Sequence, residues 1–212
     1  MKNYDQFIES KRHLGGEHGF EPIVMPEFLF PFQRELVAWA TRKGRAAIFA
    51  DCGLGKTAMQ LTWAQNVVEK SGGSVLILTP LAVANQTSEE AKKFGIEASV
   101  VSSDAEIKGP GIWITNYEKM EHFDAAQFAG VVLDESSILK SFTGTTRREL
   151  TDAFCGTKYK LCCTATPSPN DYTELGQHAE FLGICTPQQM LCTYFINDTF
   201  NTGDWRLKRH AE

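Results

Sequence analysis

The chain has 212 residues, which suits one α/β domain with extensions better than two full domains. Hydrophobic residues make up 42% of it, charged residues 22% and aromatic residues 11%, a globular composition that excludes disorder, collagen-like repeats and coiled coils. The net charge of −5 argues against a dedicated nucleic-acid coat, although charge can still cluster into a local phosphate-binding surface.

Localisation follows from what the sequence lacks. No apolar run approaches the roughly 18 residues of a membrane span, and the polar start, residues 1–11, is unlike a secretory signal. The six cysteines include no C-x-x-C pair and the five histidines are scattered, so we expect no zinc site. We therefore expect a cytoplasmic protein with free thiols and with neither a membrane nor zinc as a partner.

Apolar strands alternate with helical segments after an irregular N-terminal extension, residues 1–25. Helices are predicted over 32–42, 56–69, 81–94, 145–154 and 171–182, and strands over 46–50, 74–79, 98–102, 111–115, 131–134 and 159–164. Strands that are almost wholly apolar and alternate with helices are typical of an α/β fold, a mainly parallel sheet with helices on both faces. Such a sheet binds ligands beyond the carboxyl ends of its strands.

These elements place one domain over residues 26–185. Residues 186–212 are aromatic, interrupted by glycine and basic near their end, so we interpret them as a segment leading toward an absent second domain. Residues 140–160 carry five basic and two acidic side chains, which we interpret as a solvated helix face rather than a nucleic-acid contact.

A glycine-rich turn joins the predicted strand 46–50 to the predicted helix 56–69. It matches the phosphate-binding pattern G-x-x-x-x-G-K-[ST] except at Ala50. In that pattern backbone N–H groups converge on phosphate oxygens, Lys56 reaches the β- and γ-phosphates, and Thr57 gives a hydroxyl to Mg²⁺. The strand and helix on either side disfavour the alternative, a glycine-rich turn with a chance Lys-Thr. The predicted phosphate-loop residues are Ala50, Asp51, Cys52, Gly53, Leu54, Gly55, Lys56 and Thr57.

Two adjacent carboxylates, Asp134 and Glu135, end another apolar strand. An aspartate at a buried strand end beside a phosphate loop suits Mg²⁺ coordination, and a neighbouring glutamate can orient or deprotonate the attacking water. The alternative is a strand that runs into an acidic turn. We favour the metal site, because two buried carboxylates are costly without a cation nearby.

A Thr-Ala-Thr-Pro segment, residues 164–167, follows the last predicted strand. The hydroxyls of Thr164 and Thr166 could hydrogen-bond the acidic pair and respond to the γ-phosphate. Alone, this segment would be interpreted as a plain exit from a strand into a turn. Its position after the phosphate-loop pattern and the acidic pair favours the functional interpretation.

In this order the motifs resemble the first RecA-like domain of superfamily two helicases and translocases, of the DEAD/DEAH type and closest to the Swi/Snf-like branch, including phage and prophage members. The resemblance extends over about residues 32–182. Residues 50–57 are similar to motif I, where alanine is common at the first position, residues 134–137 to motif II, and residues 164–167 to motif III. Gln33 resembles the glutamine of the family that recognises adenine.

The resemblance implies a RecA-like P-loop NTPase domain that uses ATP and Mg²⁺. It implies catalytic roles for Lys56, Asp134 and Glu135, with Thr57 and Asp134 at the metal. Ser137, Thr164 and Thr166 would couple the nucleotide to motion. Ser137 is a departure, because motif II normally has histidine or aspartate at this position, and that departure concerns coupling rather than the metal or the water.

Nucleic-acid contacts follow by the same resemblance. Residues 78–81 are similar to motif Ia and residues 114–118 to motif Ib, which contact the sugar–phosphate backbone. Hydroxyls, amides and backbone N–H groups at strand ends hold phosphates without reading bases. Without the resemblance, Thr79-Pro80 would be a helix-start signal and Asn116 a helix cap. The predicted contact residues are Thr79, Pro80, Thr115 and Asn116.

Three functions fit this sequence to different degrees. We favour the ATP-binding lobe of a motor that moves on DNA rather than RNA, in a bacterial cell or a phage-infected host, and that needs a second RecA-like domain in cis or in trans. The alternative is a nucleotide-binding module with little hydrolysis of its own, because the chain shows no arginine finger in a nucleotide-binding motif. A small-metabolite kinase is disfavoured by the Gln33 helix and the two later motifs.

Overall fold

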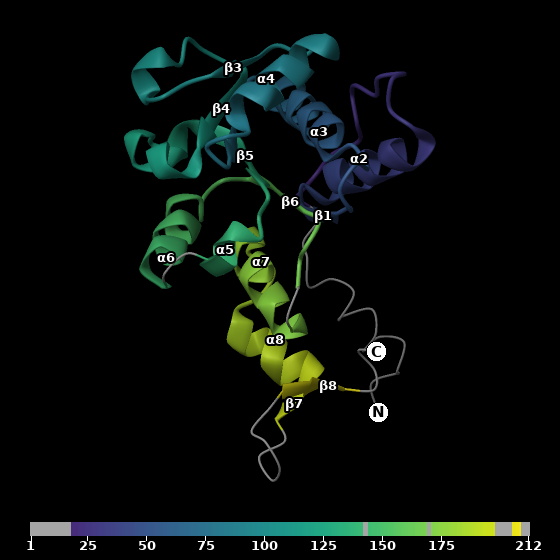
Figure 1. Cartoon of the computed structure of the whole chain (residues 1–212), viewed down its shortest axis with the longest axis vertical. Helices are drawn as coiled ribbons and strands as arrows, with labels where there is room; N and C mark the ends of the chain where they lie inside the picture. The colour runs from purple at the N-terminus through teal and green to yellow at the C-terminus, as the bar shows by residue number, and fades with distance from the viewer. Residues whose placement is uncertain (1–17, 142–143, 169–170, 198–204, 209–212) are drawn as a thin grey trace.

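Six parallel strands form one sheet, which confirms the predicted α/β fold (Figure 1). The computed structural model describes residues 18–141, 144–168, 171–197 and 205–208. The spatial order of the strands is β1-β6-β5-β2-β4-β3. Their bounds are β1 Arg45–Phe49, β2 Ser74–Thr79, β3 Ala98–Val100, β4 Ile112–Asn116, β5 Phe128–Asp134 and β6 Tyr159–Thr164.

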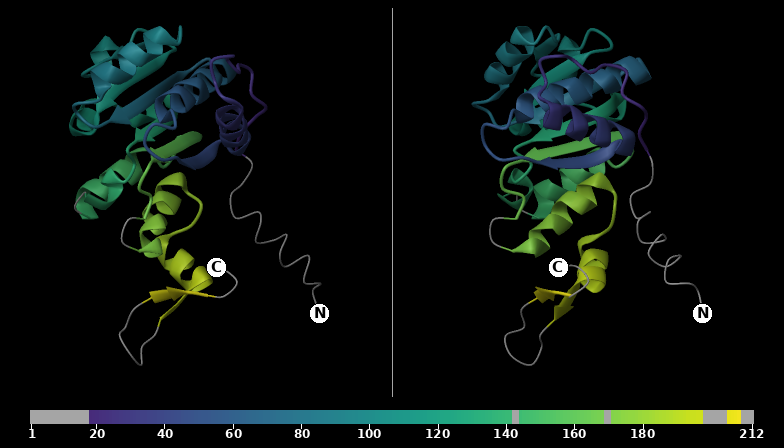
Figure 2. Two further views of the ribbon diagram at one scale, coloured as in Figure 1. Left: turned by 45° about the vertical axis from the view of Figure 1, so that its right-hand side comes forward. Right: turned by 90° about the vertical axis from the view of Figure 1, so that its right-hand side faces the viewer.

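Helices cover both faces of this sheet (Figure 2). One layer holds α2 Pro31–Lys43, α3 Lys56–Ser71 and α4 Ala84–Lys93. The opposite layer holds α5 Ile138–Ser141, α6 Gly144–Ala153 and α7 Leu175–Leu182. Short 3₁₀ helices complete the connections, namely η1 Asp104–Glu106, η2 Tyr117–His122, η3 Ala125–Gln127 and η4 Tyr172–Glu174.

Two apolar cores lie on the two faces because neighbouring strand residues point in opposite directions. Val132 of β5 packs with α2, α3 and α4, whereas Val131 and Leu133 pack on the other face. Cys162 and Cys163 divide in the same way, and both are fully buried. This two-sided burial explains why the strands are almost wholly apolar.

Parallel register brings the ends of distant strands to one edge of the sheet. Phe49 at the end of β1 pairs with Thr164, and Asp134 at the end of β5 pairs with Cys163. The segments that follow β1, β5 and β6 therefore start side by side, as the sequence predicts for a ligand site.

Residues 18–25 pack against the domain, although the sequence suggests an irregular extension up to residue 25. Phe20 N–H donates to Thr41 O, and the buried Asn66 Oδ1 of α3 accepts from the amides of Ile23 and Val24. The Asn66 amide group donates back to Val24 O at 2.7 Å. Residues 1–17 lie outside the described residues, so the domain boundary stays a prediction.

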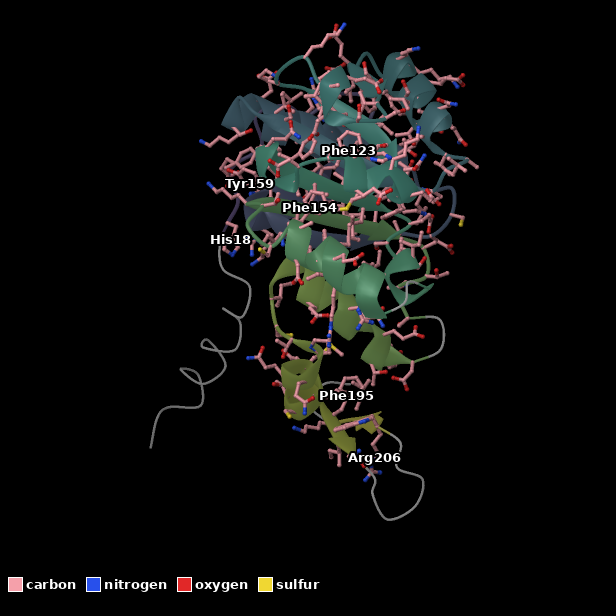
Figure 3. The ribbon with its side chains drawn as sticks, turned by 90° about the vertical axis from the view of Figure 1, so that its left-hand side faces the viewer. His18, Phe123, Phe154, Tyr159, Phe195 and Arg206 are labelled. Atoms are coloured by element: carbon pink, nitrogen blue, oxygen red, sulfur yellow. The ribbon has the colours of Figure 1, made fainter. Side chains whose placement is uncertain are left out.

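An appendage that the sequence did not predict follows α7. Helix α8 Pro187–Tyr194 and the antiparallel strands β7 Phe195–Asn197 and β8 Trp205–Leu207 extend away from the sheet (Figure 2). Figure 3 places Phe195 and Arg206 there, far from Phe123 in the main body. The Lys208 ammonium donates to the carbonyls of Cys192 and Thr193, which holds the hairpin against the end of α8.

The basic stretch 140–160 differs in part from its interpretation as a solvated helix face. Arg148 and Lys158 are exposed, but Lys160 lies in β6 and is only 2% exposed. Its ammonium donates to Phe181 O of α7 at 2.9 Å and lies 5.2 Å from the centre of the Phe181 ring. Lys160 therefore fastens α7 to the sheet, a role that a local charge count does not reveal.

Candidate functional site

The phosphate loop lies between β1 and α3, as predicted. Gly53 and Gly55 adopt φ values of +80° and +74°, which favour glycine, and Gly55 is the N-cap of α3. The Lys56 ammonium donates to Ala50 O at 3.1 Å and to Asp51 O at 3.3 Å. Two carbonyls of the loop therefore bind the Lys56 ammonium, and residues 51–54 of the loop are exposed to solvent.

Gln33 lies directly behind this loop. Its Nε2 donates to Leu54 O at 3.0 Å, and its Oε1 accepts from Phe30 N at the start of α2. A Cβ at position 55 would displace the end of the Gln33 side chain, and the φ of +74° itself favours glycine there. The glutamine predicted to recognise adenine therefore also fixes the loop against α2.

Asp134 is a buried carboxyl, 6% exposed, at the end of β5. Burial, followed by the neighbouring Glu135 charge, raises the pKa of Asp134 to about 6, while Gln60 and Lys56 act in the opposite direction. The Tyr117 hydroxyl donates to the backbone carbonyl of Asp134 at 2.7 Å and fixes this strand end. A buried carboxyl beside a second one is an environment that a cation would stabilise.

Glu135 begins the turn after β5 in a left-handed conformation, with φ +48°. The Thr164 hydroxyl donates to Glu135 Oε2 at 3.3 Å, and the amide of Thr166 donates to the Thr164 hydroxyl. Thr164 O in turn accepts from the amide of Ala50. The three motifs that the sequence singled out therefore meet through Thr164.

Gln60, one helical turn after Lys56, is a site residue that the sequence reading missed. It is fully buried on α3, and its amide lies near enough to Asp134 to lower the pKa of that carboxyl. Neither Gln60 Nε2 nor Oε1 makes a hydrogen bond of ordinary geometry to the described residues. The i, i+4 spacing from Lys56 could have indicated it, because such residues share one helix face.

The donor set fits Mg²⁺. This ion prefers oxygen ligands, keeps several waters, and needs one or two carboxylates. Asp134 would supply the carboxylate and Thr57 the hydroxyl, while the buried Gln60 amide beside Asp134 would suit a metal-bound water. The chemistry of these residues supports the predicted metal ligands, whose role stays a prediction.

His178 of α7 is a second residue that the sequence reading missed. Its Nε2 lies 3.0 Å from the hydroxyl of the fully buried Ser136, within motif II. Ser137, which was predicted to couple nucleotide and motion, is half-buried beside it, and Thr166 is exposed. No local pattern indicates the contact of His178, because 42 residues separate it from Ser136.

The predicted nucleic-acid residues present few side-chain groups to solvent. Thr79 is fully buried and Thr115 is 1% exposed, and the Thr79 hydroxyl donates to backbone oxygens. The Asn116 side chain caps η2 by accepting from Lys119 N, which matches the capping alternative. Contacts of these segments with phosphates stay a prediction, and they would have to use backbone groups or a rearranged turn. Among the described residues, no helix is both long and apolar enough to cross a membrane.

Comparisons with known proteins agree with this geometry. The family model described as DEAD/DEAH box helicase matches residues 30–175. A search among curated proteins gave no match. Among solved structures, the Sulfolobus solfataricus SWI2/SNF2 ATPase core in complex with dsDNA is similar, with a TM-score of 0.67 and 22% identity over 82% of this chain. The UvsW helicase of bacteriophage T4 has a TM-score of 0.62 and 12% identity over 88% of this chain. The Pyrococcus furiosus Hef helicase domain has a TM-score of 0.59 and 16% identity over 72% of this chain.

This chain corresponds to only part of each of these solved structures. The chain spans 40% of the Sulfolobus protein, 67% of UvsW and 36% of the Hef domain. The family model, however, extends over more than half of the chain and includes all three motifs of the site. The chain belongs to the DEAD/DEAH box helicase family.

Proposed function

We propose that the chain is the ATP-binding first lobe of a nucleic-acid-dependent ATPase, which hydrolyses Mg·ATP and moves on DNA in the cytoplasm when paired with a second lobe. The observation that carries this proposal is the junction at Thr164. Its hydroxyl contacts Glu135 and its carbonyl accepts from Ala50, so one residue joins the phosphate loop to the acidic pair.

Nucleotide binding begins at Lys56. Its ammonium exchanges the carbonyls of Ala50 and Asp51 for the β- and γ-phosphates, while N–H groups at the start of α3 donate to phosphate oxygens. Gln33 lies at the base of the loop, where its Nε2 can donate to an acceptor nitrogen of adenine in exchange for its contact with Leu54 O. Without nucleotide, loop carbonyls therefore accept the hydrogen bonds that Lys56 would give to phosphate.

Hydrolysis uses the acidic pair. Asp134 and Thr57 would hold Mg²⁺, which supplies charge stabilisation at the phosphates. Glu135 holds a water by its carboxylate, with Thr164 fixing the second carboxylate oxygen. The water oxygen attacks the γ-phosphorus, its proton passes to Glu135, and the bond from the γ-phosphorus to the ADP oxygen breaks.

A second lobe would complete this reaction. An arginine finger contributes roughly 10³–10⁵ in rate where it has been measured, and we assign it to a second RecA-like domain in cis or in trans. DNA as the track is supported by the similarity to an ATPase core whose structure holds dsDNA and to a phage helicase. The isolated chain should bind ATP and hydrolyse it slowly.

ATPase rates with and without duplex DNA, measured on this chain and on a longer form that includes a second lobe, test the proposal. We expect slow hydrolysis by the chain alone and DNA-stimulated hydrolysis by the longer form. Binding of ATP without hydrolysis in both forms would instead support the nucleotide-binding module. Failure to bind ATP would refute both.

A further inference from the structure

Motif II of this chain lacks the histidine or aspartate of its relatives at position 137, yet an imidazole reaches the motif from another element. His178 of α7 is 2% exposed and lies among the residues that cover the carboxyl edge of the sheet. Its Nε2 is 3.0 Å from the Ser136 hydroxyl, which is within hydrogen-bond distance. The fully buried Ser136, in the turn after β5, therefore has a side-chain partner on α7.

Ser136 is held from two directions. Its amide donates to Cys163 O of β6 at 2.9 Å, and its side chain meets His178 of α7 as well as the Cys162 thiol of β6. The turn around it is therefore fixed to the sheet by a backbone bond and to α7 by a side-chain bond. Both bonds act one residue after Glu135.

Glu135 needs such support because of its backbone. Its φ of +48° is left-handed, and it is the sole described non-glycine residue with positive φ. A left-handed conformation is strained for a residue with a side chain and persists only where its surroundings hold it. Loosening the Ser136 anchor would let Glu135 relax and turn its carboxylate away from Thr164.

The same imidazole also contacts the start of the phosphate loop. The rings of His178 and Phe49 meet edge to face, with centroids 5.4 Å apart, and Phe49 directly precedes Ala50. One side chain of α7 therefore touches the ends of both strands that carry the phosphate loop and the acidic pair. Lys160 binds the other end of the same helix through Phe181 O.

From this geometry, and resting on the ATPase function proposed above, we infer that His178 is the positioning residue of motif II. It holds the Ser136 turn so that the Glu135 carboxylate faces the attacking water. It does so through its hydrogen bond to Ser136, and its ring contact with Phe49 keeps the phosphate loop in register with that turn.

Two substitutions separate the hydrogen bond from the packing. His178→Leu keeps apolar contact with Phe49 but loses the bond to Ser136. His178→Gln, the matched control, loses the ring but can place an amide where Nε2 lies. Single-turnover hydrolysis of radiolabelled ATP, Mg·ATP affinity and the melting temperature are measured for each variant of the full chain.

We expect His178→Leu to lower the hydrolysis rate at least about tenfold, part of the roughly 10²–10⁴ that a well-placed general base contributes. Mg·ATP affinity should stay within about twofold of the parent, because Lys56 and Asp134 are untouched. His178→Gln should recover most of the rate. A purely structural role would instead lower affinity, rate and melting temperature together.

Ser136→Ala provides a second test that does not depend on folding of the His178→Leu variant. It should slow hydrolysis to a similar degree, and the double variant should be no slower than either single one, because both remove the same bond. Parental hydrolysis in Ser136→Ala, additive losses, or a His178→Gln variant as slow as His178→Leu would each overturn the inference. A parent chain that fails to bind Mg·ATP would overturn the proposed function as well, whereas normal binding with these outcomes would overturn only the role of His178.

Discussion

Lys56 and Glu135 illustrate how single residues of this site are held before any ligand arrives. Lys56 is surrounded by two carbonyls of its own loop, and Glu135 by the hydroxyl of Thr164. A nucleotide would replace the carbonyl partners of Lys56, whereas Thr164 would keep its contact with one oxygen of Glu135. Substitution of single residues therefore tests these contacts most directly.

Replacing Lys56 with alanine should nearly abolish ATP binding. Hydrogen bonds to charged groups contribute about 1.5–3 kcal/mol each, so loss of the ammonium should weaken affinity about 10- to 100-fold or more. Titration with a fluorescent ATP analogue measures the change. Lys92→Ala, at an exposed position of α4, is the control and should bind as the parent does. Unchanged affinity in Lys56→Ala would refute the phosphate-loop assignment.

The two acidic residues should separate by role. Glu135→Gln keeps shape but loses the base, so it should bind Mg·ATP normally and lose residual hydrolysis. Asp134→Asn removes a metal ligand's charge, so ATP binding should become far less dependent on Mg²⁺. Nucleotide titrations with Mg²⁺ and with EDTA, together with hydrolysis rates, check both. Parental hydrolysis in both variants would contradict the assignment of the pair.

At the scale of elements, α7 is fastened to the sheet by a buried charge. Burial, followed by the Arg45 charge, lowers the pKa of Lys160 from 10.5 to about 8. In the unfolded chain this lysine keeps its proton up to the ordinary value. Between pH 8 and about 10.5 the folded chain therefore binds fewer protons than the unfolded one, so the contribution of Lys160 to stability should rise with pH in that interval.

Lys160→Met isolates this contribution. Between pH 8 and 10.5 the difference in free energy of unfolding, parent minus variant, should increase by up to about 3 kcal/mol, since one pKa unit corresponds to about 1.4 kcal/mol. Urea unfolding at a series of pH values measures the difference. A difference that is flat with pH, or that falls, would show that burial does not lower the pKa of Lys160.

The sequence predicted elements well where a periodic pattern or a glycine turn marks them. The strands and most helices between residues 45 and 182 are confirmed, because burial of both sheet faces makes each strand apolar. The hairpin β7–β8 was not predicted, since its strands are three residues long and bury only one side chain fully. The contact of His178 with Ser136 and the burial of Lys160 were missed for a different reason, because tertiary partners far along the chain create them.

The site was predictable to the extent that its chemistry is local. The eight predicted phosphate-loop residues are consecutive and run from the end of β1 into the first turn of α3, and positive φ values favour glycine at positions 53 and 55. For the predicted nucleic-acid contacts, the sequence shows the residue types but not their exposure. Thr79, Thr115 and Asn116 have suitable groups, but whether a hydroxyl or amide points outward depends on packing that the sequence does not display.

For the whole molecule, nucleic-acid binding by this lobe alone should be weak. The chain carries a net charge of −5, and the strand-end hydroxyls are buried, so few groups neutralise phosphates. We expect affinity near the roughly 10⁻⁴–10⁻⁶ M of non-specific binding, falling steeply with salt and indifferent to base sequence. Fluorescence anisotropy with two unrelated oligonucleotides across a salt series measures all three properties. Tight binding that distinguishes the two sequences and ignores salt would favour a sequence-specific binding module.

The strand order also sets when the ATP site can form during synthesis. β1 lies at an edge of the sheet, and among the described strands it pairs only with β6, so it has no sheet partner of this kind until residues 159–164 have left the ribosome. The predicted phosphate loop that follows β1 is therefore synthesised early but completed late, because the amide of Ala50 donates to Thr164 O and Thr164 is translated more than 100 residues later. Nascent chains arrested before β6 emerges should leave the loop open to protease and unable to bind ATP, while chains arrested beyond α7 should protect it. The first strand of the sheet to be translated is therefore among the last to be paired, and we expect the chain to bind nucleotide only after β6 has been made.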